Sequence, residues 1–194
     1  MSAEPAVGPI ATGKTVSVER CVPATVHEVA KLDWLRALNP AMAGPAARAA
    51  GAFDSLYLIR GIATGEVVGV LDAIQLSGYP GVVNVSIYTD TGRAQSGWAM
   101  EAYGLLVAAL FESGATVIHH EVLELNRPIQ RILRGIGVEP SARYREHAYI
   151  AGRYWDVLVF SYDREHWERV LRQVFPRNPI ARGTAARRSE TRAE

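Results

Sequence analysis

The feature that most constrains this chain is a change of hydrophobic period across a short polar loop. Residues 82–89 (VVNVSIYT) have the composition of a strand, whereas residues 97–112 place leucines and alanines at helical spacing. A strand, a loop and a helix in this order direct several backbone N–H groups to one place, with the positive end of the helix dipole behind them. The junction therefore suits an anion such as a pyrophosphate, and Gly97 would let it approach the backbone. On its own, however, a structural turn explains the junction better.

The other segments predict a mixed α/β fold in a single domain over residues 14–176. Turn residues at 64–65 and 78–81 favour an antiparallel meander before the junction. We expect residues 1–13 to be flexible and the Arg-rich residues 177–194 to form a flexible tail. Strands are predicted at 15–21, 55–60, 66–76, 82–89, 116–122 and within 148–162, and helices at 24–38, 97–112, 128–136 and 163–175.

Composition narrows the classes of partner. Of the 194 residues, 48% are hydrophobic and 21% charged, which is typical of a globular protein, and the net charge of +1 gives no reason to expect nucleic acid or a membrane as partner. Cys21 is the only cysteine, which excludes a disulfide within the chain and a cysteine-based zinc site. No signal-peptide pattern and no apolar run of membrane-spanning length is seen, so we expect a cytoplasmic protein.

Three further motifs occur in a fixed order after residue 82. The first motif is Asn84-Val85-Ser86-Ile87-Tyr88-Thr89-Asp90, followed seven residues later by Gly97-Trp98-Ala99-Met100-Glu101-Ala102. The second is Asn126-Arg127-Pro128-Ile129-Gln130-Arg131-Ile132-Leu133, which ends at Gly137-Val138. The third consists of residues 143–147, residues 152–156 and Trp167. Together they resemble the GNAT superfamily of N-acetyltransferases, in the branch that contains ribosomal-protein N-acetyltransferases and many small-molecule acetyltransferases. The resemblance covers residues 82–167.

This resemblance implies a mostly antiparallel central sheet, flanked by helices and splayed between the fourth strand (82–89) and the fifth (116–122). It also implies acetyl-CoA as co-substrate, without a metal. The backbone at Ile87 and Thr89 would then pair with the pantetheine arm. The pyrophosphate would be held by the loop and helix start, namely Ala94, Gln95, Gly97, Trp98 and Ala99, and Asn126 would bond to the cofactor.

The sequence departs from the family pattern where catalytic groups are often found. Ala94 stands where the motif has Gln or Arg, and Asn84 occupies a position often filled by glutamate. Ile129 replaces a frequent serine, and Leu133 lies where some relatives carry a tyrosine general acid. No catalytic residue therefore carries over from the resemblance.

Local candidates for proton transfer lie on the fifth predicted strand. The strand period places His119 and Glu121 on one face and His120 on the other. An imidazole with a neighbouring carboxylate could remove a proton from an ammonium group, so Glu121 and His119 are the catalytic candidates. Polar residues at the end of a sheet, without a catalytic role, are the alternative.

Three functions remain open at this point. The first is acetylation of a primary amine on a small metabolite or an amino-acid-like acceptor. Acetylation of a protein N-terminus is the alternative reaction, and a catalytically silent acyl-CoA-binding domain is the alternative of another class. A homodimer is also left open.

Overall fold

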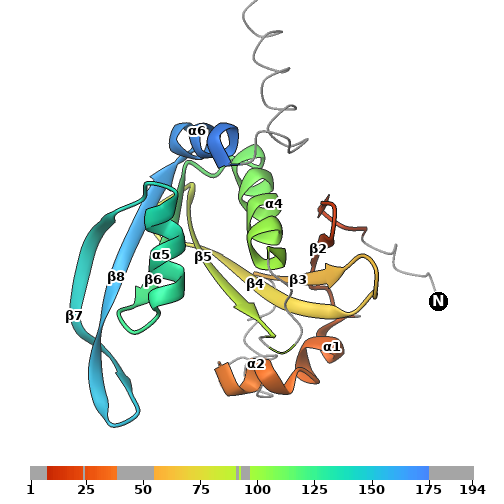
Figure 1. Ribbon diagram of the computed structural model, residues 1–194, viewed down its shortest axis with the longest axis horizontal. Helices are drawn as coiled ribbons and strands as arrows, with labels where there is room; N and C mark the ends of the chain where they lie inside the picture. Colours follow the sequence, from red (N-terminus) through yellow and green to blue (C-terminus); the bar gives the residue numbers. More distant parts are fainter. Residues whose placement is uncertain (1–7, 24, 39–54, 91, 93–96, 175–194) are drawn as a thin grey trace, which may run out of the picture. The chain divides into compact units, whose positions relative to one another are not determined.

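The computed structural model describes residues 8–23, 25–38, 55–90, 92 and 97–174. Eight strands form one sheet in the order β1-β2-β3-β4-β5-β6-β8-β7 (Figure 1). The described pairings are antiparallel except for that between β5 and β6, which is parallel. The strands are β1 (Ala11–Thr12), β2 (Val16–Arg20), β3 (Leu56–Gly61), β4 (Val67–Gln75), β5 (Val82–Thr89), β6 (Val117–Leu123), β7 (Pro140–Ile150) and β8 (Arg153–Asp163).

The chain divides into two compact units, and neither is a continuous segment. One unit, called unit 1 here, contains Met1–Ile74 and Val85–Ser113, and the other, unit 2, contains Gln75–Asn84 and Gly114–Glu194. The strand β5 is shared, because its first three residues belong to unit 2 and its last five to unit 1. No helix in the described ranges is long and apolar enough to cross a bilayer.

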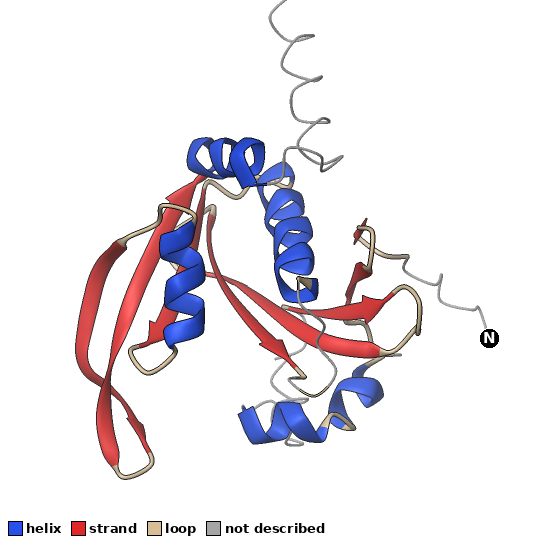
Figure 2. Cartoon of the chain, in the orientation of Figure 1, coloured by secondary structure: helices blue, strands red, loops and turns tan. Residues whose placement is uncertain are grey.

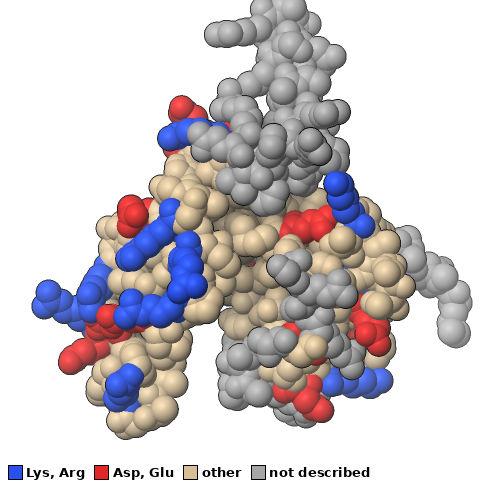
Figure 3. Space-filling view, in the orientation of Figure 1, with Lys and Arg blue, Asp and Glu red and all other residues tan. Residues whose placement is uncertain are grey.

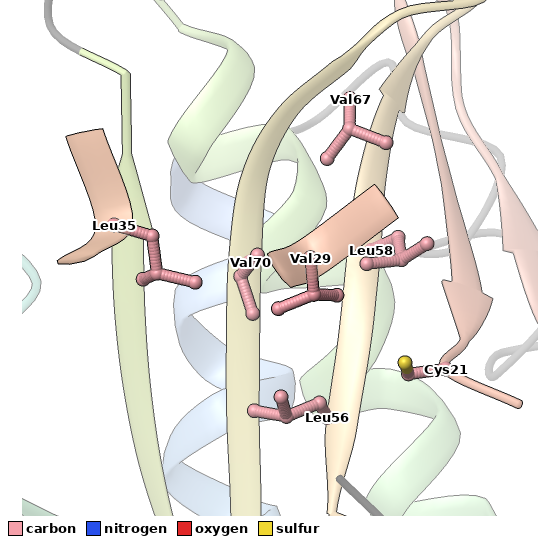
Figure 4. Close-up of a cluster of buried hydrophobic side chains, with 7 residues drawn as sticks. All are labelled: Cys21, Val29, Leu35, Leu56, Leu58, Val67 and Val70. Atoms are coloured by element: carbon pink, nitrogen blue, oxygen red, sulfur yellow. The ribbon is translucent and has the colours of Figure 1, made fainter. Parts of the chain in front are cut away.

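Unit 1 is built around a hydrophobic cluster between short helices and strands. The helices are α1 (Val26–Ala30), α2 (Asp33–Leu38) and α4 (Trp98–Glu112). The single helix predicted at 24–38 is instead two, because the chain tightens between them through the bonds Lys31 N to Glu28 O and Leu32 N to Val29 O. Figure 4 shows the buried cluster, which consists of Cys21, Val29, Leu35, Leu56, Leu58, Val67 and Val70.

A carboxylate joins α4 to the turn between β1 and β2. Glu101, in the first turn of α4, accepts hydrogen bonds from the backbone N–H groups of Lys14 and Thr15 and from the Thr15 hydroxyl. A side chain at Gly13 would displace this carboxylate from its position beside the turn. Its contact with the turn gives Glu101 a structural role at the start of the helix.

Unit 2 contains the strands β6, β8 and β7 together with the helices α5 (Arg127–Gly135) and α6 (Arg164–Val174). Along β6, buried residues alternate with more exposed ones, as expected for a strand with one covered face. The pairing of β7 with β8 continues to Ile150 and Arg153, so the tip of the β7–β8 hairpin extends past the end of β6 (Figure 2).

A β-bulge in this hairpin is held by Asp156. The pairing of β7 with β8 shifts register between Tyr144 and Ala148, and Glu146 within this segment has a φ of 50°. The Asp156 carboxylate accepts from the Glu146 backbone N–H at 2.8 Å and from the Arg143 guanidinium. These two interactions lower the pKa of Asp156 below its ordinary value, the backbone bond being the larger cause.

Candidate functional site

The junction between β5 and α4 has a backbone conformation that only glycine adopts readily. Gly97 precedes the 15-residue helix α4 with a φ of 96°, in the left-handed region. A Cβ placed on Gly97 would meet no atom of the described residues within 4 Å, so the residue borders open space on their side. The left-handed backbone thus accounts for glycine at this position, and a ligand could approach it. The predicted phosphate contacts Ala94 and Gln95 lie outside the described residues and stay predictions.

The first residues of α4 are half-buried, and one of them contacts a neighbouring strand. The Trp98 indole lies against Gly61 of β3, where an added Cβ would be 3.5 Å from the ring. Trp98 therefore has a packing function within unit 1. Ala99, also in the first turn of α4, is half-buried and lies at the end of the helix that carries the positive dipole.

The end of β5 is positioned by a close approach of β4. A Cβ on Gly69 would lie 2.9 Å from the carbonyl oxygen of Tyr88 and 3.3 Å from the Thr89 side chain. No larger residue fits at position 69, and the glycine brings the two backbones together. Ile87 and Thr89, the predicted pantetheine contacts, are both half-buried in this part of unit 1.

The parallel pairing of β5 with β6 is short. It joins Val82 to Val117, Val83 to Ile118 and Asn84 to His119, and the register goes no further. Ile87 and Thr89 thus lie beyond the part of β5 that pairs with β6. The pairing ends within the two strands between which the sequence predicts a splay.

The two catalytic candidates on β6 lie on one face of their strand. His119 is half-buried and Glu121 exposed, whereas His120 is buried on the opposite face and stacks on Tyr162 at 5.9 Å between ring centroids. His119 Nδ1 lies 3.0 Å from the Ser161 hydroxyl of β8. The described hydrogen bonds thus join His119 to Ser161 and not to Glu121, so its partner is a hydroxyl that the sequence did not indicate.

Asn84 is the β5 residue paired with His119, and its side chain carries an unmet hydrogen-bonding group. Its Oδ1 is shielded from solvent and has no hydrogen-bond partner among the described residues. An acceptor buried without a donor is unfavourable and is uncommon in folded proteins. Asn84 therefore places an uncharged amide beside His119, where a glutamate would have placed a negative charge.

Asn126 has a clear structural function at the start of α5. It is the N-cap residue, and its Oδ1 accepts from the backbone N–H of Ile129 at 3.4 Å. The buried side chain of Gln130 adds two bonds, from Nε2 to the carbonyls of Leu123 at 3.2 Å and Glu124 at 2.8 Å. The cap and the glutamine together fix the turn between β6 and α5, where the sequence predicts that Asn126 contacts the cofactor.

Charge in unit 2 is unevenly distributed. Exposed arginines at 127, 131 and 134 recur at helical spacing along α5, and Arg143 and Arg145 are exposed on β7. Figure 3 shows Lys and Arg atoms gathered on this part of the surface, with Asp and Glu atoms beside them. Among the described residues, no group of three or more His, Cys, Asp or Glu side chains is arranged to hold a metal ion.

The comparisons with known proteins identify the fold. No protein-family model and no curated protein matches the sequence. Among solved structures, a GCN5-related N-acetyltransferase from Brucella melitensis superposes with a TM-score of 0.67 at 21% identity, over 86% of this chain and 83% of that one.

Two other solved structures are similar over most of their length. A GNAT-family acetyltransferase from Bacillus anthracis has a TM-score of 0.63 at 13% identity, over 79% of this chain and 98% of that one. The ribosomal-protein-S5-alanine acetyltransferase from Vibrio fischeri has a TM-score of 0.63 at 12% identity, over 79% and 96%. At these identities the likeness establishes the fold.

Proposed function

We propose that this chain, which has the GNAT fold predicted from its sequence, transfers an acetyl group from acetyl-CoA to a primary amine. The observation that carries the proposal is the junction at Gly97. Its left-handed backbone, the open space around it and the helix that follows form the kind of site that accepts a pyrophosphate.

The cofactor contacts are assigned residue by residue. Ile87 and Thr89 would pair with the pantetheine arm, and the loop with Ala94 and Gln95, together with Gly97, Trp98 and Ala99, would hold the pyrophosphate through backbone N–H groups. Asn126 would also contact the cofactor, in addition to capping α5 through its Oδ1.

The reaction would be direct attack of the amine on the thioester. The ammonium first gives one proton to a base on the protein. The neutral amine nitrogen then forms the new C–N bond, the C–S bond breaks, and CoA leaves as its thiol with the second proton that the attacking nitrogen loses. Acceleration then comes from placing the two substrates together and from keeping the amine neutral. Glu121, with His119 on the same face of β6, is the proposed base.

A small acceptor is placed ahead of a protein N-terminus in this proposal. The arginines of α5 and the start of β7 would disfavour a basic polypeptide only where they are not already paired, and Arg134 pairs with Glu139 and Arg143 with Glu124 and Asp156. Protein N-terminal acetylation is the alternative reaction. A silent acyl-CoA-binding domain is the alternative of another class, and it predicts cofactor binding without turnover.

The first test is a thioester-cleavage assay with acetyl-CoA and a panel of small amines and N-terminal peptides, with mass spectrometry of the products. Acetylated small amines support the proposal, and acetylation of peptides alone supports the alternative reaction. Cofactor binding by calorimetry with no product in any reaction would support the silent domain and overturn the enzyme.

The second test concerns the Gly97 site itself. Gly97→Glu places a bulky anion where the pyrophosphate belongs, so we expect the affinity for acetyl-CoA to fall more than about tenfold through steric and charge repulsion. A left-handed non-glycine residue also costs stability, on the order of 1–3 kcal/mol. Calorimetry on the folded variant measures the binding.

Gly114→Glu is the matched control. Gly114 also has a left-handed backbone, with a φ of 107°, and open space around its Cβ position, but it lies after the C-terminal end of α4. We expect it to lose similar stability and to bind acetyl-CoA normally. Unchanged affinity in Gly97→Glu would remove the assignment of the cofactor site.

A further inference from the structure

A row of polar side chains crosses the sheet of unit 2 on one face. His119 of β6 is paired with Ser161 of β8, and Ser161 lies beside Ser141 of β7, with 3.4 Å between their hydroxyl oxygens. Residues paired across neighbouring strands point to the same side of a sheet, which places His119 and Ser161 together. Ser141 lies at the register shift between Pro140 and Ala142, and its distance from the Ser161 hydroxyl extends the line to β7. The line ends at the backbone, where the Ser141 hydroxyl donates to the Val159 carbonyl at 3.2 Å.

Counting hydrogens gives this line a direction. A serine hydroxyl has one hydrogen, and that of Ser141 lies toward the Val159 carbonyl. Only one arrangement then makes all three contacts hydrogen bonds, and in it Ser161 donates to Ser141 and accepts from His119 Nδ1 at 3.0 Å. The reverse direction would leave two hydroxyl oxygens 3.4 Å apart with no hydrogen between them.

We propose that Ser161 and Ser141 are positioning residues that hold neutral His119 in the tautomer with its hydrogen on Nδ1. The lone pair is then on Nε2, where the ring can accept a proton. This inference rests on the proposed function for its second half, which is that Glu121, on the same face of β6, removes the proton of the acceptor ammonium and Nε2 receives this proton in turn.

The proton can be followed through the reaction. One N–H bond of the ammonium breaks and an Nε2–H bond forms, which makes His119 an imidazolium and the amine a nucleophile. Its Nδ1–H continues to donate to Ser161, so the same hydrogen bonds that select the tautomer also stabilise the charged ring. After acetyl transfer the proton passes from Nε2 to water.

The tautomer can be measured without any substrate. In uniformly ¹⁵N-labelled protein, long-range ¹H–¹⁵N correlations of the imidazole rings distinguish the two tautomers, at a pH about two units above the ordinary histidine pKa of ~6.5. Histidine in water prefers the hydrogen on Nε2, so a His119 ring with its hydrogen on Nδ1 would reflect the serine line. His119→Gln identifies the His119 signals by their disappearance.

Three variants test the direction of the line. Ser141→Ala frees the Ser161 hydrogen to turn toward Nδ1, so we expect His119 to change to the Nε2–H tautomer, and Ser161→Ala should have the same effect. Ser161→Thr keeps the hydroxyl and should keep the parent tautomer. His120, on the opposite face of β6, is the internal control and should not change. Parent His119 with its hydrogen on Nε2, or no change in Ser141→Ala, would overturn the proposal.

The role in transfer is tested separately in the thioester assay. Ser141 touches neither the ring nor the substrate, so in Ser141→Ala we expect kcat to fall about tenfold or more while the KM for acetyl-CoA stays the same, and Ser161→Thr to retain activity. A changed tautomer with an unchanged kcat would overturn the proton-accepting role. Absence of any transfer by the parent would overturn the proposed function and that role with it, and the spectra would still decide the tautomer.

Discussion

At the scale of single residues, the chemistry proposed for this chain depends on β6 and its neighbours. Sequence reasoning found His119 and Glu121, because the period of a strand is enough to place them on one face. It missed Ser161 and Ser141, because a residue becomes a partner only through the register between strands, and register is not visible in a single sequence. The pairing of His119 with Ser161 is such a case.

Glu121 is the residue whose assignment can be tested most directly. Glu121→Gln keeps the size of the side chain and removes its basicity. An alkylammonium with a pKa of ~10 is neutral in only about one molecule in a thousand at pH 7, so a missing base should lower kcat by up to ~10²–10⁴-fold. We expect kcat to recover partly as the pH rises toward that of the free amine, measured as a pH–rate profile.

Glu112→Gln, an exposed change of the same kind at the end of α4, is the control and should match the parent. If Glu121→Gln also matches the parent from pH 6 to 9, Glu121 is not the base.

At the scale of elements, the sequence predicted the helices that have a clear hydrophobic spacing and missed strands that are exposed or very short. The helices α4, α5 and α6 lie where hydrophobic spacing and capping residues predict them. The first part of β7 was missed, because residues 140–147 are exposed or nearly so and therefore show no alternation of apolar and polar residues. The strand β1 was missed because it has two residues.

The helix α5 offers a prediction that separates two functions of one residue. Asn126→Ala removes the N-cap and should cost about 0.5–2 kcal/mol of unfolding free energy, whereas Asn126→Ser can still cap the helix. If Asn126 also contacts the cofactor through its amide, both variants should raise the KM for acetyl-CoA. Thermal unfolding and steady-state kinetics on both variants give the comparison. A serine variant with parental KM would make the residue purely structural.

At the scale of the whole molecule, global stability should respond to pH through a buried carboxyl group. Burial raises the pKa of Asp72 above its ordinary value, against hydrogen bonds from Ser55 Oγ at 2.6 Å and the Ala73 backbone that lower it. The folded protein therefore binds this proton more tightly than the unfolded chain does. The stability from Asp72 is complete below its unfolded pKa of ~3.9 and is lost as the pH rises through the folded pKa.

Asp72→Asn keeps an acceptor for Ser55 and removes the charge. We expect the unfolding free energy of the variant, relative to the parent, to increase as the pH rises from about 4 to about 7, measured by urea unfolding. Asp156→Asn is the control of opposite sign, because the pKa of Asp156 is lowered and its stability is present above the ordinary value and lost as the pH falls. A flat difference for Asp72→Asn would contradict the prediction.

The division of the chain has a consequence for how this protein could be taken apart or recombined. The backbone passes between the units after Ile74, after Asn84 and after Ser113. No single stretch of a gene encodes either unit, so neither can be obtained by truncation, exchanged as a cassette between related genes, or duplicated as a block. The shortest continuous segment that contains all of unit 1, residues 1–113, also carries a strand-sized piece of unit 2, and the shortest that contains all of unit 2, residues 75–194, also carries residues 85–113 of unit 1.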